Sequence, residues 1–362
     1  MAEIRKIGEF VQQVDIRNSE LSVTRLLGVT LAKQFIPSVA NLNGVDLSTY
    51  KVIRKNQFGA KFMSVARDGI LPVALYLDET PSIISSAYYV FEVSKPKLLL
   101  PEYLMLWLRR TEFDRELWFF SGGDVRGGVT WQDFCDVRIV VPSFEEQSRI
   151  VRENGILHSR QTYLKRAIET IEDYCDALYF KYFPKEAVGT EGSSTMVSVD
   201  FFANLKAGGD KPAVFSETKT KQCCVPVFSN SVENEGLFGY TDKAVIEKES
   251  ITITARGINV GRCFLRRCPF VPIVRLIVIT PKDSRYTLYL YHFFKNLNIE
   301  GDGSAQSQYT IPQLKQERIP IPDDVLINKF NQEAILLFEY KDYCTKELSI
   351  IQQLMDASLK LL

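Results

Sequence analysis

The sequence contains few of the residues that metal sites and many active sites need. Its 362 residues include only two histidines, His158 and His292, and seven cysteines that form no Cys-x-x-Cys pair. A structural zinc site draws its ligands from such residues at short spacings, so none is expected. An odd number of cysteines without a secretory framework indicates reduced thiols, as in a cytosol.

Long hydrophobic runs and a leader segment are missing as well. The first ten residues carry charges at Glu3, Arg5, Lys6 and Glu9, which does not fit a signal peptide. The longest tempting apolar stretch, residues 273–280, is interrupted by an arginine and is far shorter than the roughly 18 residues of a membrane helix. We therefore expect no membrane association and a cytoplasmic location.

The common signatures of enzymes are also absent. The sequence has no Gly-x-x-x-x-Gly-Lys-Ser/Thr phosphate loop and no Asn/Asp-Pro-Pro-aromatic methyltransferase box. A Ser–His–Asp set would need His158 or His292, and both lie in segments with the pattern of packed helices. Asp323 and Glu339 resemble a nuclease pair, but they fall along one helical segment, whereas two metal-binding acids normally meet at strand ends. No catalytic role is expected for this chain.

Net charge is lacking too, because 44 basic side chains face 44 acidic ones. This balance excludes a histone-like binder that relies on charge alone, but it is compatible with a reader of base sequence that has local basic patches. Hydrophobic residues make up 46% of the chain, which is ample for folded cores. Since a single core rarely serves a chain of this length, two globular domains are expected.

The most informative feature that is present is an internal repeat with an offset of 180 residues. Residues 129–142 resemble residues 309–322, and the register continues into two ladders of apolar residues with heptad spacing. The seam positions are Ile150, Leu157, Leu164, Ile171 and Leu178 in the first ladder and Phe330, Leu337, Cys344 and Ile351 in the second. A two-line heptad seam is typical of long helices that pair.

The repeat predicts four parts: a globular module (residues 1–143), a helix (144–184), a second module (185–322) and a final helix (323–362). Each module alternates short strand patterns with one helix, at residues 101–118 and 286–297, so the fold class is α+β with an internal pseudo-repeat. Helices of about 40 residues form rods of about 60 Å. We expect the two helices to pair antiparallel; the alternative is that each packs only on its own module.

Each module carries a glycine-rich loop at an equivalent place, at residues 121–128 and 300–308. Glycine allows the backbone to approach a phosphate closely. In the first loop, Arg126 offers a fork that suits guanine or phosphate. The second loop offers hydrogen-bonding side chains that suit bases and backbone, namely Ser304, Gln306, Gln308 and Tyr309. The recurrence favours DNA contact, although a plain structural turn explains either loop taken alone.

A second repeated element is a short turn that carries an arginine, Arg67 in the first module and Arg256 in the second. Both are candidates for DNA contact, and the alternative is an ordinary turn arginine paired with a surface acid. Basic residues elsewhere in the second module, among them Lys219 and Lys221, are candidates for phosphate contacts. Runs of charge of this kind are also common on solvated surfaces.

Together these residues resemble the DNA-specificity (S) subunit of type I restriction–modification systems. The likeness rests on Val-Pro-Val-Phe-Ser-Asn at 225–230, on Gly-Leu-Phe-Gly-Tyr at 236–240 and on the Arg-Gly turn at 255–257. It also rests on the exits of the two modules into their helices, at 124–147 and 303–322. The first module has no clear equivalent of residues 225–230, so the two modules belong to different sequence types.

The resemblance implies two target recognition domains separated by two antiparallel helices, each domain reading one half of a split, asymmetric site in double-stranded DNA. It implies helices that set the spacer between the halves and dock two methyltransferase (M) subunits, which restriction (R) subunits join. The S-adenosylmethionine, ATP and Mg²⁺ of such systems belong to the partner subunits, and no cofactor is expected on this chain.

Three other hypotheses fit parts of the sequence. One is a coiled-coil scaffold with two protein-binding modules and no role on DNA. Another is a nuclease or methyltransferase with an unrecognised site. The last keeps the DNA role but places the chain in a type II-like modification system.

Overall fold

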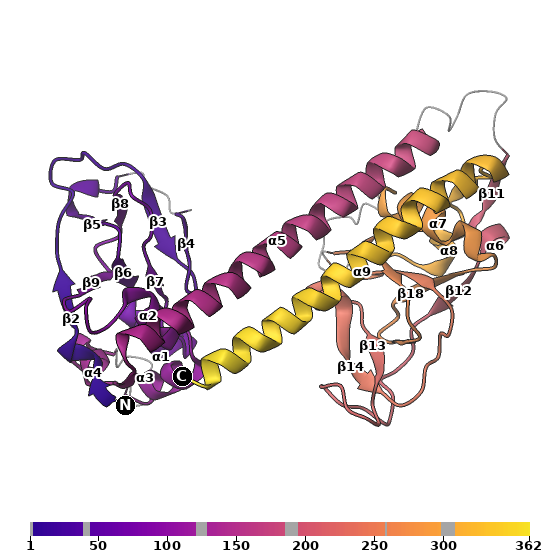
Figure 1. Cartoon of the computed structure of the whole chain (residues 1–362). Helices are drawn as coiled ribbons and strands as arrows, with labels where there is room; N and C mark the ends of the chain where they lie inside the picture. The colour runs from indigo at the N-terminus through magenta and orange to yellow at the C-terminus, as the bar shows by residue number, and fades with distance from the viewer. Residues whose placement is uncertain (1–2, 39–43, 121–128, 185–194, 258, 298–307) are drawn as a thin grey trace. The chain divides into compact units, whose positions relative to one another are not determined.

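The computed structural model describes residues 3–38, 44–120, 129–184, 195–257, 259–297 and 308–362. Figure 1 follows the chain from one sheet-rich module through a long helix to a second module and a second long helix. Two compact units divide it: residues 1–165 with 346–362, and residues 166–345. Each unit therefore contains one module and part of both long helices, α5 (Phe144–Tyr182) and α9 (Asp324–Lys360).

The first module consists of short strands and short helices. Its strands are β1 (Glu3–Lys6), β2 (Val11–Val14), β3 (Leu26–Val29), β4 (Phe35–Pro37), β5 (Lys51–Ile53), β6 (Gln57–Ala60), β7 (Val73–Leu75), β8 (Ser82–Ile84), β9 (Tyr89–Val93) and β10 (Arg138–Val141). Its helices are α1 (Val65–Asp68), α2 (Pro101–Leu108), α3 (Thr111–Phe120) and α4 (Trp131–Asp136).

The second module is also built of short strands and short helices. Its strands are β11 (Met196–Ser198), β12 (Ala203–Ala207), β13 (Val225–Phe228), β14 (Leu237–Thr241), β15 (Ser250–Ile253), β16 (Cys263–Arg266), β17 (Val271–Pro272), β18 (Ile277–Pro281) and β19 (Arg318–Pro320). Its helices are α6 (Val199–Phe202), α7 (Thr287–Lys295) and α8 (Ile311–Leu314).

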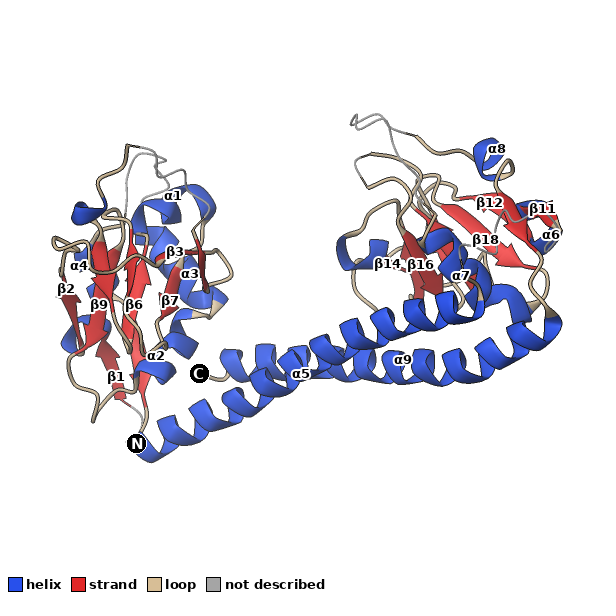
Figure 2. Cartoon of the chain, turned by 90° about the horizontal axis from the view of Figure 1, so that it is seen from above, coloured by secondary structure: helices blue, strands red, loops and turns tan. Residues whose placement is uncertain are grey.

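The two modules share one topology. In the first, the strand order is β2-β9-β6-β7, and in the second it is β12-β18-β15-β16. Figure 2 shows the strands of each module in red and its helices in blue. A smaller sheet contains a parallel pair in each case, β3 with β8 and β13 with β17. The first and last strands of each module pair antiparallel, β1 with β10 and β11 with β19. The predicted α+β fold with an internal repeat is thus confirmed.

The segment predicted as one helix at residues 101–118 is two helices, α2 and α3, with a break at Arg109 and Arg110. A buried ion pair lies at the break: the Nζ of Lys33 bonds both carboxylate oxygens of Asp114 and also donates to the carbonyl of Leu108. That carbonyl would otherwise serve the next helical turn. The sequence pattern could not reveal it, since Lys33 lies far away in the chain.

The strand predicted at residues 273–280 is also interrupted. Val274 and Arg275 have positive φ angles of 54° and 58°, so the first part of the run leaves the extended conformation and β18 begins only at Ile277. Their N–H groups bond the carbonyls of Gly209 and Gly208. A Cβ at Gly208 would lie 2.8 Å from the carbonyl oxygen of Ile273, so glycine is needed for this close approach.

The halves of α5 and α9 that belong to the first unit pair antiparallel. Arg160 makes two bonds to Glu347, at 2.7 and 2.8 Å, and Ser358 donates to Asn154 at 3.1 Å. Leu164 and Ile351 are buried apolar seam positions, while Ile150 and Leu157 are half-buried. Asn154 and Gln161 are buried polar positions on the same face, and polar seam residues of this kind fix the register of paired helices.

The halves in the second unit pair as well. Tyr182 donates to Glu333 at 2.5 Å, and Lys341 bonds Glu172. Ile171, Leu178, Phe330 and Cys344 are buried and Leu337 is half-buried, and most of them join the core of the second module. The halves therefore pair with each other and also pack on the module of their own unit, which combines the two packing alternatives.

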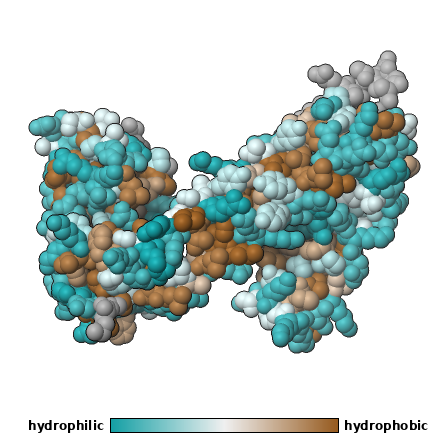
Figure 3. All heavy atoms as spheres, in the orientation of Figure 1, coloured by the Kyte–Doolittle hydropathy of each residue, from teal (hydrophilic) through white to brown (hydrophobic). Residues whose placement is uncertain are grey.

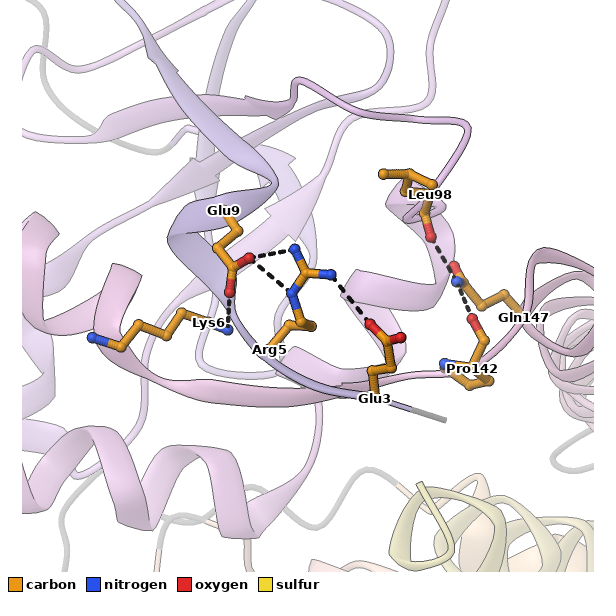
Figure 4. Close-up of polar contacts among 7 residues, drawn as sticks. All are labelled: Glu3, Arg5, Lys6, Glu9, Leu98, Pro142 and Gln147. Atoms are coloured by element: carbon orange, nitrogen blue, oxygen red, sulfur yellow. Dashed lines mark hydrogen bonds and ion pairs between the residues drawn. The ribbon is translucent and has the colours of Figure 1, made fainter. Parts of the chain in front are cut away.

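A buried glutamine joins α5 to the first module. Gln147 donates to the carbonyls of Leu98 and Pro142, at 2.8 and 2.9 Å, and accepts from the N–H of Leu100 at 2.9 Å. Figure 4 shows this side chain between the helix and the module, beside a surface cluster of Glu3, Arg5, Lys6 and Glu9. Because all three hydrogen bonds of this side-chain amide go to backbone groups of the protein, Gln147 holds the start of α5 in one orientation.

Among the helices that the structure describes, none combines the length and hydrophobicity of a membrane span. Within the same residues, His, Cys, Asp and Glu side chains form no group of three or more that could hold a metal ion.

Candidate nucleic-acid interface

Three segments that are far apart in the sequence meet beyond the end of β15 in the second module. Arg256 forms an antiparallel bridge with Gln308, and the N–H of Tyr309 donates to the carbonyl of Ala255 at 2.9 Å. On the other side, Asn230, just after β13, bonds both Ala255 and Arg256. These segments are the Arg-Gly turn, the end of the second glycine-rich loop and the Val-Pro-Val-Phe-Ser-Asn segment. The structure thus brings together elements that the sequence presented separately.

The Arg256 turn has a defined shape because Thr254 closes it. The N–H of Gly261 donates to the carbonyl of Thr254 at 2.9 Å, and the N–H of Arg262 donates to the Thr254 hydroxyl at 2.9 Å. Gly257 and Gly261 have φ angles of 81° and 85°, a conformation that glycine adopts without strain. These bonds and glycines allow the chain to reverse direction between β15 and β16.

The side chains of Arg256 and Gln308 are exposed at this point. No ion pair of Arg256 is found among the described residues, so within that part of the chain its guanidinium is not neutralised by a carboxylate. A cation and an amide side by side offer the donors and acceptors that base edges and phosphates bind. This pair is the part of the site with the chemistry for DNA contact.

Tyr309 has a different environment from Arg256. Its side chain is 9% exposed, and its hydroxyl donates to Glu317 at 3.0 Å. Burial, together with that bond, raises the pKa of Tyr309 well above its usual value. Its contribution to the site is therefore through the backbone bond to Ala255, which fixes the turn.

Arg266, on β16, is a buried residue that supports the site from the interior of the module. It is 3% exposed, its guanidinium lies 3.7 Å above the centre of the Phe228 ring, and its Nε donates to Thr252 at 3.0 Å. Its NH2 donates to the carbonyl of Glu235 at 2.5 Å. Burial lowers the pKa of Arg266 to about 10, and the group stays charged at neutral pH. It ties the β13–β14 hairpin to β15. The sequence offered it only as part of a basic run at residues 262–267 that suits phosphate contacts, and did not reveal this structural role.

Lys219 and Lys221 are exposed but lie outside this group of contacts. Lys219 is close enough to Cys268 to counteract the effect of burial, which raises the pKa of that thiol. Cys268 follows the end of β16 that is opposite the Arg256 turn. The structure therefore does not bring Lys219 to Arg256, and a phosphate contact of either lysine stays a prediction.

In the first module, the equivalent turn between β6 and β7 contains α1 and Arg67. Arg67 is exposed, and it bonds both carboxylate oxygens of its neighbour Asp68 at 2.8 Å. The alternative of a turn arginine paired with a surface acid thus describes its state in this structure. Arg126, Ser304 and Gln306 lie outside the described residues, and their predicted DNA contacts stay predictions.

A partly buried polar cluster anchors α7 on α5 within the second unit. His292 bonds Asp176 through Nδ1 at 2.8 Å, and Lys295 donates to the same carboxylate at 2.7 Å. Burial by itself raises the pKa of Asp176, but the bonds from His292 and Lys295 outweigh it and lower that pKa to about 2. His292 is fully buried and, as expected, has a packing role. The helix that precedes the second glycine-rich loop is thereby fixed.

Comparison with known proteins finds a family match in the second module. The family model for the type I restriction modification DNA specificity domain matches residues 199–336. The resemblance of the chain to type I specificity subunits, drawn from its sequence, is therefore confirmed.

Two relatives from Mycoplasma pneumoniae, each named "Putative type I specificity subunit", are similar to parts of the chain. One is 35% identical over 115 residues, which cover 32% of this chain and 34% of the relative. The other is 29% identical over 191 residues, or 52% of each protein. The matches thus span about a third and about half of these curated relatives.

A solved structure extends the likeness to the whole fold. The crystal structure of a type I restriction-modification S subunit from M. genitalium has a TM-score of 0.64 and 16% identity, and the match covers 99% of this chain and 95% of that one. At this identity the similarity shows the fold alone. It agrees with two sheet-rich modules and two long helices in one chain.

Proposed function

We propose that this chain is the non-catalytic DNA-specificity subunit of a type I restriction–modification complex. The observation that carries the proposal is the repeated module, in which one topology places an arginine turn between equivalent strands, β6 and β7 or β15 and β16. In the second module this turn lies within a family-matched specificity domain, with Arg256 and Gln308 exposed side by side. Each module reads one half of a split site in double-stranded DNA.

The two half-sites differ in sequence. The second module holds Arg256 unpaired by any described acid and clamped by Asn230, whereas the first holds Arg67 on α1 in contact with Asp68. Since the side chains offered to the bases differ, the combined site is asymmetric rather than palindromic. Two modules held by one pair of helices multiply specificity through effective concentration.

The exposed surfaces of α5 and α9 carry a repeated apolar pattern that suits a partner present in two copies. Three pairs of exposed apolar side chains recur at the repeat offset of 180 residues, and each is between 51% and 67% exposed. Figure 3 shows hydrophobic residues that reach the surface along α9. The pairs are Ile156 with Leu336, Tyr163 with Tyr343, and Tyr174 with Leu354. Because the same pattern occurs twice, we assign it to two copies of one partner, the methyltransferase subunit.

The chemistry of the complex belongs to the partners in this proposal. Methyltransferase subunits bind S-adenosylmethionine and methylate adenine, and restriction subunits supply ATP- and Mg²⁺-dependent translocation and cleavage. The chain itself binds no cofactor, and its place is the cytoplasm, where the DNA of its host lies. A type II-like modification complex with the same DNA role is the second candidate, since the family match concerns the specificity domain and not the partners.

Replacing Arg256 tests the assignment of half-sites. Arg256→Ala is expected to reduce methylation about tenfold or more and to relax base preference in one half-site only, because a good arginine–base contact provides most of the discrimination at one position. The measurement is the methylation rate of the assembled complex on duplexes altered in either half. An equal loss at both halves contradicts independent modules.

Charge placed on the exposed helix face tests the partner assignment. Ile156→Asp with Tyr163→Asp is expected to lower the ratio of methyltransferase to specificity subunit from two to one, because the apolar contact is lost at one of two equivalent places. Leu336→Asp with Tyr343→Asp is the matched pair and should have the same effect at the other place. Native mass spectrometry measures the ratio. A ratio of two in both variants excludes this face as the contact with the methyltransferase subunit.

A further inference from the structure

The side chain of Asn230 holds the backbone of the Arg256 turn from one side. Its Nδ2 donates to the carbonyl of Arg256 at 3.1 Å, and its Oδ1 accepts from the N–H of Ala255 at 2.5 Å. An asparagine amide carries its donor and its acceptor on one rigid plane. The two bonds therefore fix both the position and the direction of the backbone that bears Arg256.

The other side of the same backbone is also bonded. The carbonyl of Ala255 accepts from the N–H of Tyr309 at 2.9 Å, and Arg256 bridges Gln308. Residues 255 and 256 are thus held between Asn230 and the end of the second glycine-rich loop, while the Arg256 side chain stays exposed. Because the backbone of Arg256 is already ordered, the residue loses less conformational freedom when its side chain binds DNA.

Asn230 is itself held by a rigid support. The N–H of Ser229 donates to the carbonyl of Gly236 at 2.8 Å, which closes the loop between β13 and β14. A Cβ at Gly236 would lie 2.7 Å from the carbonyl oxygen of Ser229, and its φ is 81°, so the loop needs glycine there. Arg266 then ties this hairpin to β15. Asn230 is therefore held in place by the β13–β14 loop and by Arg266, and neither is part of the Arg256 turn.

We propose that Asn230 is a positioning residue for DNA recognition: its amide fixes the Arg256 turn, so that Arg256 reads one position of the second half-site. This inference rests on the proposed function of the chain. It applies to the second module alone, because Arg67 in the first module lies on a helical turn and bonds Asp68.

The test uses the full chain assembled with its methyltransferase partner. Asn230→Ala, Arg256→Ala and the double variant are compared on duplexes with single base changes in either half-site. Asn230→Ala is expected to reduce methylation about tenfold and to relax discrimination at the same position as Arg256→Ala. The double variant should be no worse than Arg256→Ala alone, because both changes remove one contact. Discrimination in the first half-site should not change.

Two further variants separate positioning from stability. Asn230→Asp keeps the size and the acceptor but loses the donor, so it should relax the same base position without leaving a void. Asn204→Ala, at an exposed strand position of the same module, should behave like the unaltered chain. Thermal unfolding of each complex shows whether it is folded. If Asn230→Ala does not assemble, the isosteric Asn230→Asp carries the comparison with Arg256→Ala.

Several results overturn the inference. Additive losses in the double variant, or unchanged base preference in Asn230→Ala and Asn230→Asp, remove the link between Asn230 and Arg256. A lower unfolding temperature with base preference intact assigns Asn230 to stability only. If the unaltered complex methylates no split site, the proposed function itself fails. If the unaltered complex methylates a split site and the Asn230 variants keep its base preference while Arg256→Ala does not, the positioning role alone fails.

Discussion

Leu164→Asp is expected to separate the paired helices of the first unit and to lower the free energy of unfolding by about 4 kcal/mol. Leu164 is 1% exposed and lies on the seam beside Gln161, which donates to Gln352 across the pair at 2.7 Å. A carboxylate at this position is either buried without a partner or forces the helices apart. Both outcomes also expose the apolar neighbours of the seam.

The measurement is thermal unfolding of the purified full chain, where a loss of this size lowers the midpoint by about 10 °C in a unit of about 180 residues. Ile156→Asp is the matched control, because the same change on the same helix falls on a side chain that is 63% exposed. That variant should unfold like the unaltered chain and yet bind less methyltransferase. A normal midpoint for Leu164→Asp refutes the seam assignment.

Lengthening both helices by one heptad is expected to lengthen the spacer of the recognised site by about three base pairs. Seven residues add about 10 Å to a helix, and each base pair takes up about 3.4 Å along DNA. Insertions after Leu164 in α5 and after Leu348 in α9 keep the heptad register of both seams. The base sequences of the two halves should not change, because neither module is touched.

The spacer is read by sequencing methylated DNA from cells that express the variant with its methyltransferase. An insertion in α5 alone is the informative control, since it shifts the seam of one helix against the other and should disturb spacer selection. A double insertion that methylates sites with the original spacer contradicts the role of the helices as a ruler.

The sequence predicted the large features because they repeat at a constant offset. Heptad spacing alone placed both long helices, and the seam positions Leu164, Ile171, Leu178, Phe330 and Ile351 are buried in the structure. It also placed arginine turns between equivalent strands. A repeat reports topology well, since the same local pattern must solve the same packing problem twice.

The sequence could not predict contacts between distant segments. Lys33 bonds the Leu108 carbonyl at the break between α2 and α3, Asn230 bonds the backbone of the Arg256 turn, and Arg266 bonds the Glu235 carbonyl between β13 and β14. Each of these side chains acts on backbone groups that lie far from it in the chain. Asn230 did belong to a segment that carried the family likeness, but only the fold shows that it clamps a turn some 25 residues later.

The central claim is that this chain chooses the DNA sequence for partner enzymes. Single-molecule methylome sequencing of a host that expresses the chain with its methyltransferase tests it most directly. The account predicts a split, asymmetric adenine-methylation motif that disappears when the chain is deleted and changes in one half only when Arg256 is replaced. An unchanged methylome, with the methyltransferase expressed and active, contradicts the account.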